Sequence, residues 1–352
     1  MKKLSYLFFL SIIVLSACTK LDDDEPLIPP HNQLGDGFFV LNQGNFTSGN
    51  ASLSFFEEGS GTMTNNLFFK KNGAPLGDVA QSITFWKEEA FLVVNNSAYI
   101  YVIDSKTGLY KRKIAELESP RYLQIVNADK AYVSDFQLKG IFVFNPITMQ
   151  PQGVIETGKS TEAMVMVDYE VFVTNWSAYN QSTANNTVQV IDVAVDALVD
   201  SIVVGKEPNS IVVDQNKKLW VLCSGGYLNE EIPSLIRIDP ASRTIEKRYN
   251  FSTIESAPEQ LKINAAGNTL YYLNDGIYTM DIADAELPAS PLISSEGRNF
   301  FALGLHPYEQ TILASDAGNY VQNGWVYRFK TDGMLVDSLQ SGIIPGHFGF
   351  NY

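Results

Sequence analysis

The 352-residue chain has few cysteines, few histidines and a deficit of positive charge. Its two cysteines, Cys18 and Cys223, offer no disulfide framework. The three histidines, His31, His306 and His347, lie far apart in the sequence and do not have the spacing of a His-rich metal site. Lys and Arg number 25 against 39 Asp and Glu, and the net charge of -14 argues against a nucleic-acid partner, since phosphate binding needs a basic surface.

Long hydrophobic runs are also missing, except at the N-terminus. Lys2 and Lys3 precede an apolar stretch over 4–15, which is too short to span a membrane as a mature helix. The stretch ends in Leu-Ser-Ala-Cys at 15–18, which resembles the bacterial lipobox. The resemblance implies a signal peptide over 1–17 and a lipid on Cys18, so we expect contact with the membrane through the lipid anchor only.

A polar, acidic and Pro-rich segment follows over 18–36. Such a composition cannot bury a core, so we predict a flexible tether. The acidic run directly after Cys18 resembles the surface-export signal of Bacteroidetes lipoproteins, although a solvated linker would have the same composition. We therefore expect an outer-membrane lipoprotein that faces the cell surface.

One pattern then repeats along the chain: an apolar strand that ends in an acid, an amide or, once, a lysine, followed by a turn. The seven copies occupy 53–57, 99–104, 141–145, 188–192, 235–239, 277–281 and 326–330. Their end positions are 41 to 49 residues apart, a period typical of propeller blades. A turn-starting Asp or Asn can bond the backbone just beyond it and close a tight hairpin.

Three further strands accompany each copy. One precedes it directly, another precedes that one and often opens with proline, as at Pro120, Pro208 and Pro258, and a fourth follows the turn. The first unit lacks its opening strand, and a spare one lies at 345–350. We therefore predict an all-β, seven-bladed β-propeller over 37–352 as one domain, with four-stranded blades and the C-terminal strand completing blade one. Removal of the last eight residues should destabilise the domain.

In a propeller, the ends of the second strands and the starts of the first strands converge on one mouth of the central channel. In this chain these positions are rich in amides, and the loops beside them carry aromatic residues. Rings can stack on the faces of a flat ligand while amides bond its edge groups. Ordinary solvated turns are the alternative interpretation. The predicted ligand-binding rim consists of Asn45, Phe46, Asn95, Arg121, Tyr122, Asp135, Phe136, Asn175, Trp176, Tyr179, Tyr227, Asn274, Tyr320, Trp325 and His347.

Two segments carry a family resemblance. The turn YVIDSKTG at 101–108 and the approach GKEPNS at 205–210 resemble YncE-like seven-bladed propellers. The opening GFFVLNQGNF at 37–46, followed by NASLS at 50–54, is similar to BtuG-like surface lipoproteins of Bacteroidetes. That resemblance, which covers 37–352, implies capture of cobalamin and its delivery to a TonB-dependent outer-membrane transporter. Cobalamin would be a transported ligand, and no cofactor is expected.

Other functions stay open. Exposed aromatics suit a glycan or another nutrient as well as a corrinoid, and a propeller can also serve as a scaffold for protein contacts. The chain has no Gly-x-Ser-x-Gly elbow, phosphate loop or dinucleotide fingerprint, so we expect no enzyme. Some propellers hydrolyse lactones or glycans with carboxylates in the channel, and Glu162 and Glu259 near first-strand starts are the candidates for such a role.

Overall fold

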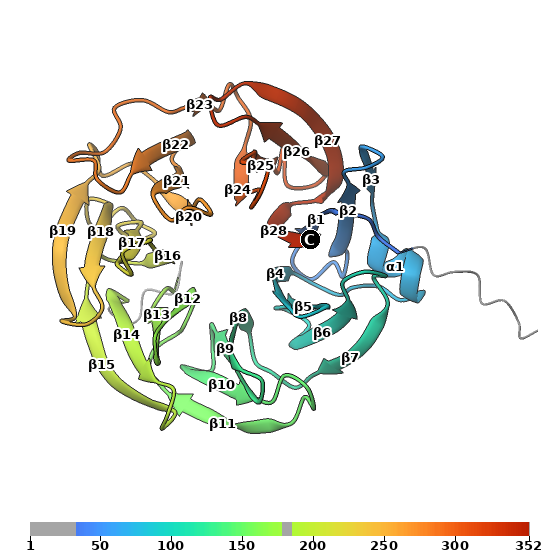
Figure 1. The fold of residues 1–352 in the computed structure, drawn as a ribbon, viewed down its shortest axis with the longest axis horizontal. Helices are drawn as coiled ribbons and strands as arrows, with labels where there is room; N and C mark the ends of the chain where they lie inside the picture. Colours follow the sequence, from blue (N-terminus) through green and yellow to red (C-terminus); the bar gives the residue numbers. More distant parts are fainter. Residues whose placement is uncertain (1–32, 178–184, 352) are drawn as a thin grey trace, which may run out of the picture. The chain divides into compact units, whose positions relative to one another are not determined.

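The computed structural model describes residues 33–177 and 185–351, which include twenty-eight strands and one short helix. The strands form seven antiparallel sheets of four strands each, arranged in a ring (Figure 1). The predicted seven-bladed β-propeller is confirmed. The predicted signal peptide, Cys18 and most of the tether lie outside the described residues.

The blades are numbered in chain order, and the strands of each blade are given from the innermost to the outermost. The innermost strand of blade one is the exception to chain order, because it comes from the C-terminus. Blade one consists of β28 (Pro345–Asn351), β1 (Gly37–Asn42), β2 (Ser52–Glu57) and β3 (Thr62–Thr64). Blade two consists of β4 (Ala80–Trp86), β5 (Glu89–Val94), β6 (Tyr99–Asp104) and β7 (Tyr110–Ile114). Blade three consists of β8 (Pro120–Asn127), β9 (Lys130–Asp135), β10 (Gly140–Phe144) and β11 (Pro151–Glu156). Blade four consists of β12 (Met164–Val167), β13 (Glu170–Thr174), β14 (Thr187–Asp192) and β15 (Ala197–Val203).

The last three blades repeat the same order. Blade five consists of β16 (Pro208–Val213), β17 (Leu219–Cys223), β18 (Ser234–Asp239) and β19 (Thr244–Asn250). Blade six consists of β20 (Glu259–Ile263), β21 (Thr269–Leu273), β22 (Gly276–Asp281) and β23 (Ile293–Ser294). Blade seven consists of β24 (Phe300–Leu305), β25 (Ile312–Asp316), β26 (Asn323–Phe329) and β27 (Leu335–Ile343).

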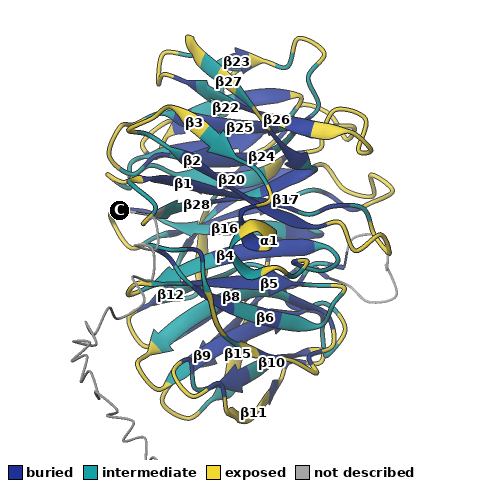
Figure 2. Ribbon diagram, turned by 90° about the vertical axis from the view of Figure 1, so that its right-hand side faces the viewer, coloured by how far each residue is buried: buried dark blue, intermediate teal, exposed yellow. Residues whose placement is uncertain are grey.

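The second and third strands of each blade are apolar on both faces, because each blade is packed between two others. Along β1, Phe39 and Leu41 pack toward blade two, whereas Phe38 and Val40 pack toward blade seven. Side chains alternate between the two faces of a strand, so one strand serves two interfaces. The described residues contain seven such apolar clusters, one at each blade–blade joint. Figure 2 shows these strands as buried and the loops as the exposed part.

The repeated acid or amide closes the turn that follows it, as predicted. Oδ1 of Asp104 accepts hydrogen bonds from the backbone N–H groups of Lys106 at 3.1 Å and Thr107 at 2.9 Å. Oδ1 of Asn145 does the same two and three residues further along the chain. These bonds replace the backbone partners that the turn itself cannot supply.

The ring closes through blade one, where β28 pairs with β1 in antiparallel register from Gly37 opposite Asn351 to Leu41 opposite His347. The N-terminal part of the domain and the last strand of the chain therefore share one sheet. The predicted closure by the C-terminal strand is confirmed.

One element was not predicted from the sequence. Helix α1 (Leu67–Asn72) follows β3 and buries Leu67 and Phe68 in the joint between blades one and two. At six residues it is too short for a recognisable apolar period. No described helix has the length and hydropathy to cross a membrane.

Candidate functional site

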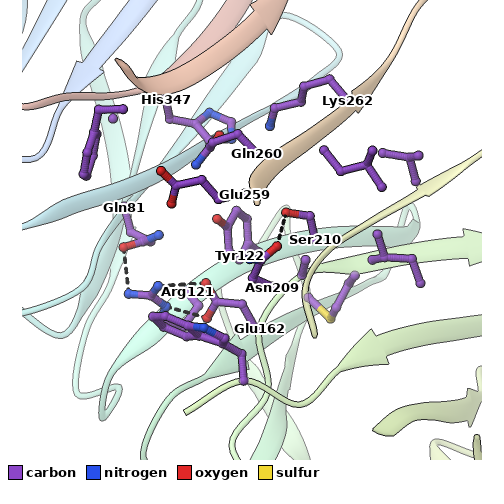
Figure 3. Close-up of a pocket in the computed structure, with 18 of the residues that line it drawn as sticks. Gln81, Arg121, Tyr122, Glu162, Asn209, Ser210, Glu259, Gln260, Lys262 and His347 are labelled. Atoms are coloured by element: carbon purple, nitrogen blue, oxygen red, sulfur yellow. Dashed lines mark hydrogen bonds and ion pairs between the residues drawn. The ribbon is translucent and has the colours of Figure 1, made fainter. Parts of the chain in front are cut away.

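The innermost strands surround a cavity of about 530 Å³ at the mouth where these strands begin; we refer to it as the channel cavity. Every blade contributes to its wall: His347, Gln81, Arg121, Met164, Ser210, Glu259 and Phe301. Several of the innermost strands carry a register shift at this mouth, for example β8 between Pro120 and Leu123 and β20 between Glu259 and Lys262. Such bulges interrupt the regular alternation of side chains between the two faces of a strand, so they change the direction in which a side chain points. Figure 3 shows the resulting ring of polar groups.

A rigid cation cluster occupies one side of the mouth. Nε and Nη2 of Arg121 donate to the two carboxylate oxygens of Glu162, each at 2.7 Å, and Nη1 donates to Oε1 of Gln81 at 2.7 Å (Figure 3). The guanidinium carbon lies 5.2 Å from the ring centre of Trp176. Burial opposes the charge of Arg121, but the attraction of Glu162 outweighs it and holds the pKa of Arg121 above its usual value. The bidentate ion pair, the bond to Gln81 and the stacking on the indole together fix the side chains of Arg121, Glu162, Gln81 and Trp176.

Glu259 faces the channel on the other side of Tyr122. Its surface is exposed to the channel, yet it lies deep within the ring, and this desolvation raises the pKa of its carboxyl group to about 7. Desolvation also raises the pKa of the Tyr122 hydroxyl to about 12, with a further contribution from the charge of Glu162. At neutral pH, Tyr122 is therefore a neutral hydrogen-bonding group, and Glu259 is divided between its two protonation states.

Lys262 and His347 lie at the end of the cavity away from the Arg121 cluster, which we call the Lys262 end (Figure 3). Both side chains keep some exposed surface but are surrounded by the walls of the channel. Desolvation lowers the pKa of the Lys262 ammonium to about 8. Desolvation and the nearby charge of Lys262 lower the pKa of His347 to about 3, so this imidazole is neutral. Lys262 was not predicted as a site residue. A comparison of blades could have found it, because the corresponding positions of β8 and β16 hold the uncharged Gln124 and Val212.

Of the predicted rim residues, the structure brings four into the wall of the channel cavity: Arg121, Tyr122, Trp176 and His347. Phe136 lies beside them, with its ring centre 5.9 Å from that of Trp176. The other charged and amide residues of the lining were absent from the predicted rim: Gln43, Gln81, Glu162, Asn209, Glu259, Gln260 and Lys262. Of these, Glu162 and Glu259 were the candidate channel carboxylates of the sequence analysis, and both line the cavity.

Four more predicted residues are large exposed rings on the loops or strand ends around the same mouth. Their exposed fractions are 69% for Phe46, 66% for Tyr227, 44% for Tyr320 and 41% for Trp325, and we call them the rim aromatics. The loops of blades one and seven touch, since the side-chain amide of Asn45 donates to the carbonyl of Tyr320 at 2.5 Å. Tyr179 lies outside the described residues.

Three residues of the predicted rim are hydrogen-bonded within the protein. Asp135 is 2% exposed and accepts from the backbone N–H groups of Ser119, Gln137 and Leu138. Asn175 is fully buried and is bonded within its own blade. The side-chain amide of Asn95 donates hydrogen bonds to the hydroxyl of Ser119 and to the carbonyl of Pro120. Hydrogen bonds within the protein thus take up the side chains of Asp135, Asn175 and Asn95, and a contact of these residues with a ligand stays a prediction.

Asn274 is a fourth departure from the predicted rim. It lines a separate hollow between blades five and six, together with Tyr272 and Tyr278. Its Oδ1 accepts a hydrogen bond from the backbone N–H of Ala257 at 3.1 Å. The structure does not bring it to the channel cavity.

One carboxylate–histidine group lies outside the channel: Glu58, His306 and Glu309 have side-chain atoms close enough to suggest a metal site. Nδ1 of His306 accepts from the backbone N–H groups of Glu309 at 2.7 Å and Tyr308 at 3.2 Å. Nε2 must then carry the proton, which it donates to Glu58 at 2.8 Å. A metal at Nε2 would have to displace this proton, so these bonds favour a hydrogen-bonded anchor over a metal site.

The fold and the cavity define a class: a seven-bladed β-propeller with a polar cavity at one mouth of its channel. Within that class, the chain belongs to the family described as "Domain of unknown function (DUF5074)", whose profile matches residues 36–343. No curated protein matches the chain.

Solved structures share the fold at low sequence identity. A quinonprotein alcohol dehydrogenase-like protein from Bacteroides thetaiotaomicron superimposes with a TM-score of 0.72 at 16% identity, over 91% of this chain and 79% of that one. A periplasmic gluconolactonase from Pseudomonas aeruginosa has a TM-score of 0.64 at 14% identity, over 90% of this chain and 99% of that one. These likenesses support the propeller fold and leave the YncE-like and BtuG-like resemblance as a prediction.

Proposed function

We propose that this protein is a lipid-anchored surface protein that captures a nutrient at the mouth of its propeller channel, with a corrinoid as the leading ligand. One observation supports this proposal most strongly. The channel cavity, the stacked Arg121–Trp176 pair and the four rim aromatics all lie at the same mouth of the propeller. Large rings that stay exposed around a concave polar site are typical of ligand-binding surfaces.

The chemistry of a corrinoid suits this arrangement. A corrin is a flat macrocycle with many side-chain amides, so its faces can stack on Phe46, Tyr320 or Trp325 while its amides meet polar groups of the mouth. The channel cavity, at about 530 Å³, is too small to enclose the whole molecule. The macrocycle would therefore lie across the mouth, with one side chain reaching inward.

The rest of the proposal concerns delivery. The lipobox-like sequence that ends in Cys18 and the acidic run after it support an outer-membrane anchor that faces the cell surface. A protein tethered there could hold a ligand over a TonB-dependent barrel and release it into that transporter. A glycan would satisfy the same aromatic surface and is the alternative ligand.

Gel filtration of the chain from Thr19 onward, which keeps all of the compact unit Leu34–Tyr352, tests the proposal. The protein is mixed with cyanocobalamin, and the visible absorbance of the corrin is followed. Co-elution with the protein is expected. Elution of all the corrin at the position of the free vitamin at micromolar concentrations would reject the corrinoid and direct the search to glycans.

Hydrolysis is a second candidate, favoured by one observation. Glu259 has a carboxyl pKa of about 7 and lies in the cavity beside Tyr122, so it could give or take a proton at neutral pH. Turnover of a lactone panel by the native protein, lost in Glu259→Gln and kept in the surface variant Glu255→Gln, would support it. Rates no higher than buffer for the native protein would remove it.

A further inference from the structure

The Lys262 end of the channel cavity contains a cation that has no counterion among the described residues. Arg121 at the mouth is paired with Glu162, whereas Lys262 forms no hydrogen bond or ion pair with any residue that the structure describes. Neither Lys262 nor Glu259 perturbs the pKa of the other. An ammonium group that is withdrawn from bulk water without a partner is costly, and such groups in proteins normally meet a counterion, a ligand or water.

A second polar atom beside Lys262 also lacks a side-chain partner within the described part of the chain. Nδ1 of His347 is buried without a hydrogen bond of ordinary geometry, although an interaction with the backbone of Phe348 favours the protonated ring. Figure 3 shows His347, Lys262 and Gln260 at one end of the cavity, away from the Arg121 cluster. Leu261, the neighbour of Lys262 in β20, and Val212 are among the apolar residues that line the cavity. The Lys262 end thus combines an unneutralised cation and neutral hydrogen-bonding groups in a cavity with apolar lining, which is how sites for small organic ligands are built.

We propose that the Lys262 end of the channel cavity binds a small organic oxyanion, whose oxygens accept hydrogen bonds from the Lys262 ammonium and from the amide of Gln260. The oxyanion would supply the counterion that no described residue provides. This inference extends the proposed capture function inward, and it depends on the same cavity being open but not on a corrinoid at the rim.

The other charged and titratable groups of the cavity determine how binding responds to pH. Arg121 stays protonated and is neutralised by Glu162, while Tyr122 and His347 stay neutral through the physiological range. Glu259 gains a negative charge above a pKa of about 7, and Lys262 loses its positive charge above a pKa of about 8. Both changes oppose an anion, so affinity is highest below pH 7 and falls as the pH rises.

The size of this fall follows from Lys262 alone. With a pKa of about 8, nearly all of its amine is charged at pH 6.5 and roughly one tenth at pH 9, so oxyanion affinity should drop at least about tenfold. Calorimetric titration with D-gluconate at both pH values, at constant ionic strength, measures it. Sorbitol, which has no carboxylate, is the matched neutral probe and should not bind.

Trace acetylation of the native protein with acetic anhydride at pH 7.5 provides an independent readout. Lys262 should be among the most reactive lysines, because roughly a quarter of its amine is unprotonated there, against about one in a thousand for an ordinary lysine. D-gluconate or inorganic phosphate should protect Lys262 by at least about fivefold in a saturable manner and leave the exposed Lys330 unchanged.

Two variants separate the outcomes. Lys262→Met keeps the length of the side chain among apolar neighbours and should abolish gluconate binding, while Lys330→Met should retain it; thermal unfolding verifies that both fold. Failure of both gluconate and phosphate to bind and to protect Lys262, or equal protection of Lys330, would overturn the oxyanion site. Corrin co-elution is measured separately, so a failure of oxyanion binding at Lys262 can be distinguished from a failure of corrin binding at the channel mouth.

Discussion

Replacement of Phe348 by alanine should loosen the joint that closes the ring. Phe348 is 7% exposed, lies opposite Val40 in the β1–β28 ladder and packs edge-on against Phe38 with ring centres 6.3 Å apart. Truncation of a buried Phe to Ala costs about 3 to 5 kcal/mol, because apolar contact is lost and a cavity is left. We expect a loss of that size in the free energy of unfolding.

Gly304 of blade seven offers the opposite perturbation at the same place. A Cβ atom on Gly304 would lie 2.8 Å from the ring of Phe348. The backbone of Gly304 is not in the left-handed region, so Gly304→Ala introduces a clash without backbone strain. Its expected cost is about 1 to 3 kcal/mol. In the double variant the new methyl occupies space that the ring vacated, so the double variant should lose less than the sum of the two single losses.

Urea unfolding of the two single variants and the double variant, followed by far-UV circular dichroism, measures these values. Phe69→Ala is the matched control, since Phe69 is 57% exposed on α1 and its loss should stay within about 0.5 kcal/mol. A loss below about 1 kcal/mol for Phe348→Ala, or strictly additive losses in the double variant, would refute the role assigned to this joint. Deletion of 345–352 should be more damaging than any point substitution.

Three further predictions concern charged and reactive side chains. Glu162→Gln leaves the Arg121 guanidinium without its carboxylate and should lower the free energy of unfolding by about 3 kcal/mol in urea titrations. Arg112 lowers the pKa of Glu89 to about 2, so the stability that this carboxylate contributes is present above pH 4.5 and lost as the pH falls toward 2. The free energy of unfolding of Glu89→Gln should therefore be about 1 kcal/mol below that of the native protein at pH 7. This difference should vanish as the pH falls from 4.5 to 2. Burial raises the pKa of the Cys223 thiol to about 12, so a thiol reagent should react with it only after unfolding, and rapid reaction in the native state would contradict its burial.

The sequence predicts the fold well because each blade carries its own local signal. Asp104 and Asn145 end their strands and close their turns through bonds two and three residues away, so both the pattern and its cause are local. The spare strand at 345–350 could likewise be placed, since the first unit lacks one. Helix α1 could not be predicted because fewer than two turns give no apolar period, and its position depends on the packing of Leu67 and Phe68 in the joint between blades one and two.

The candidate site is less predictable because it depends on neighbouring blades. Whether Asn175 faces a ligand or bonds Ser160 and Gln189 depends on the exact geometry inside blade four, which the strand pattern does not fix. The stacking of Arg121 on Trp176 joins blades three and four, and no spacing in the sequence reveals it. Lys262 reaches the cavity after a bulge in β20, where alternation no longer indicates which way a side chain faces.

If a ligand binds at the channel mouth, the indole of Trp176 should contact it, because this ring lines the cavity and stacks on Arg121. Cyanocobalamin co-elution should be compared among the native protein, Trp176→Ala and the control variant Tyr169→Ala. The ring of Tyr169 is 78% exposed in the turn between β12 and β13 and does not line the channel cavity. We expect co-elution with the native protein and Tyr169→Ala, and loss of most of the bound corrin in a folded Trp176→Ala. Undiminished corrin binding by Trp176→Ala would place the site away from the channel mouth.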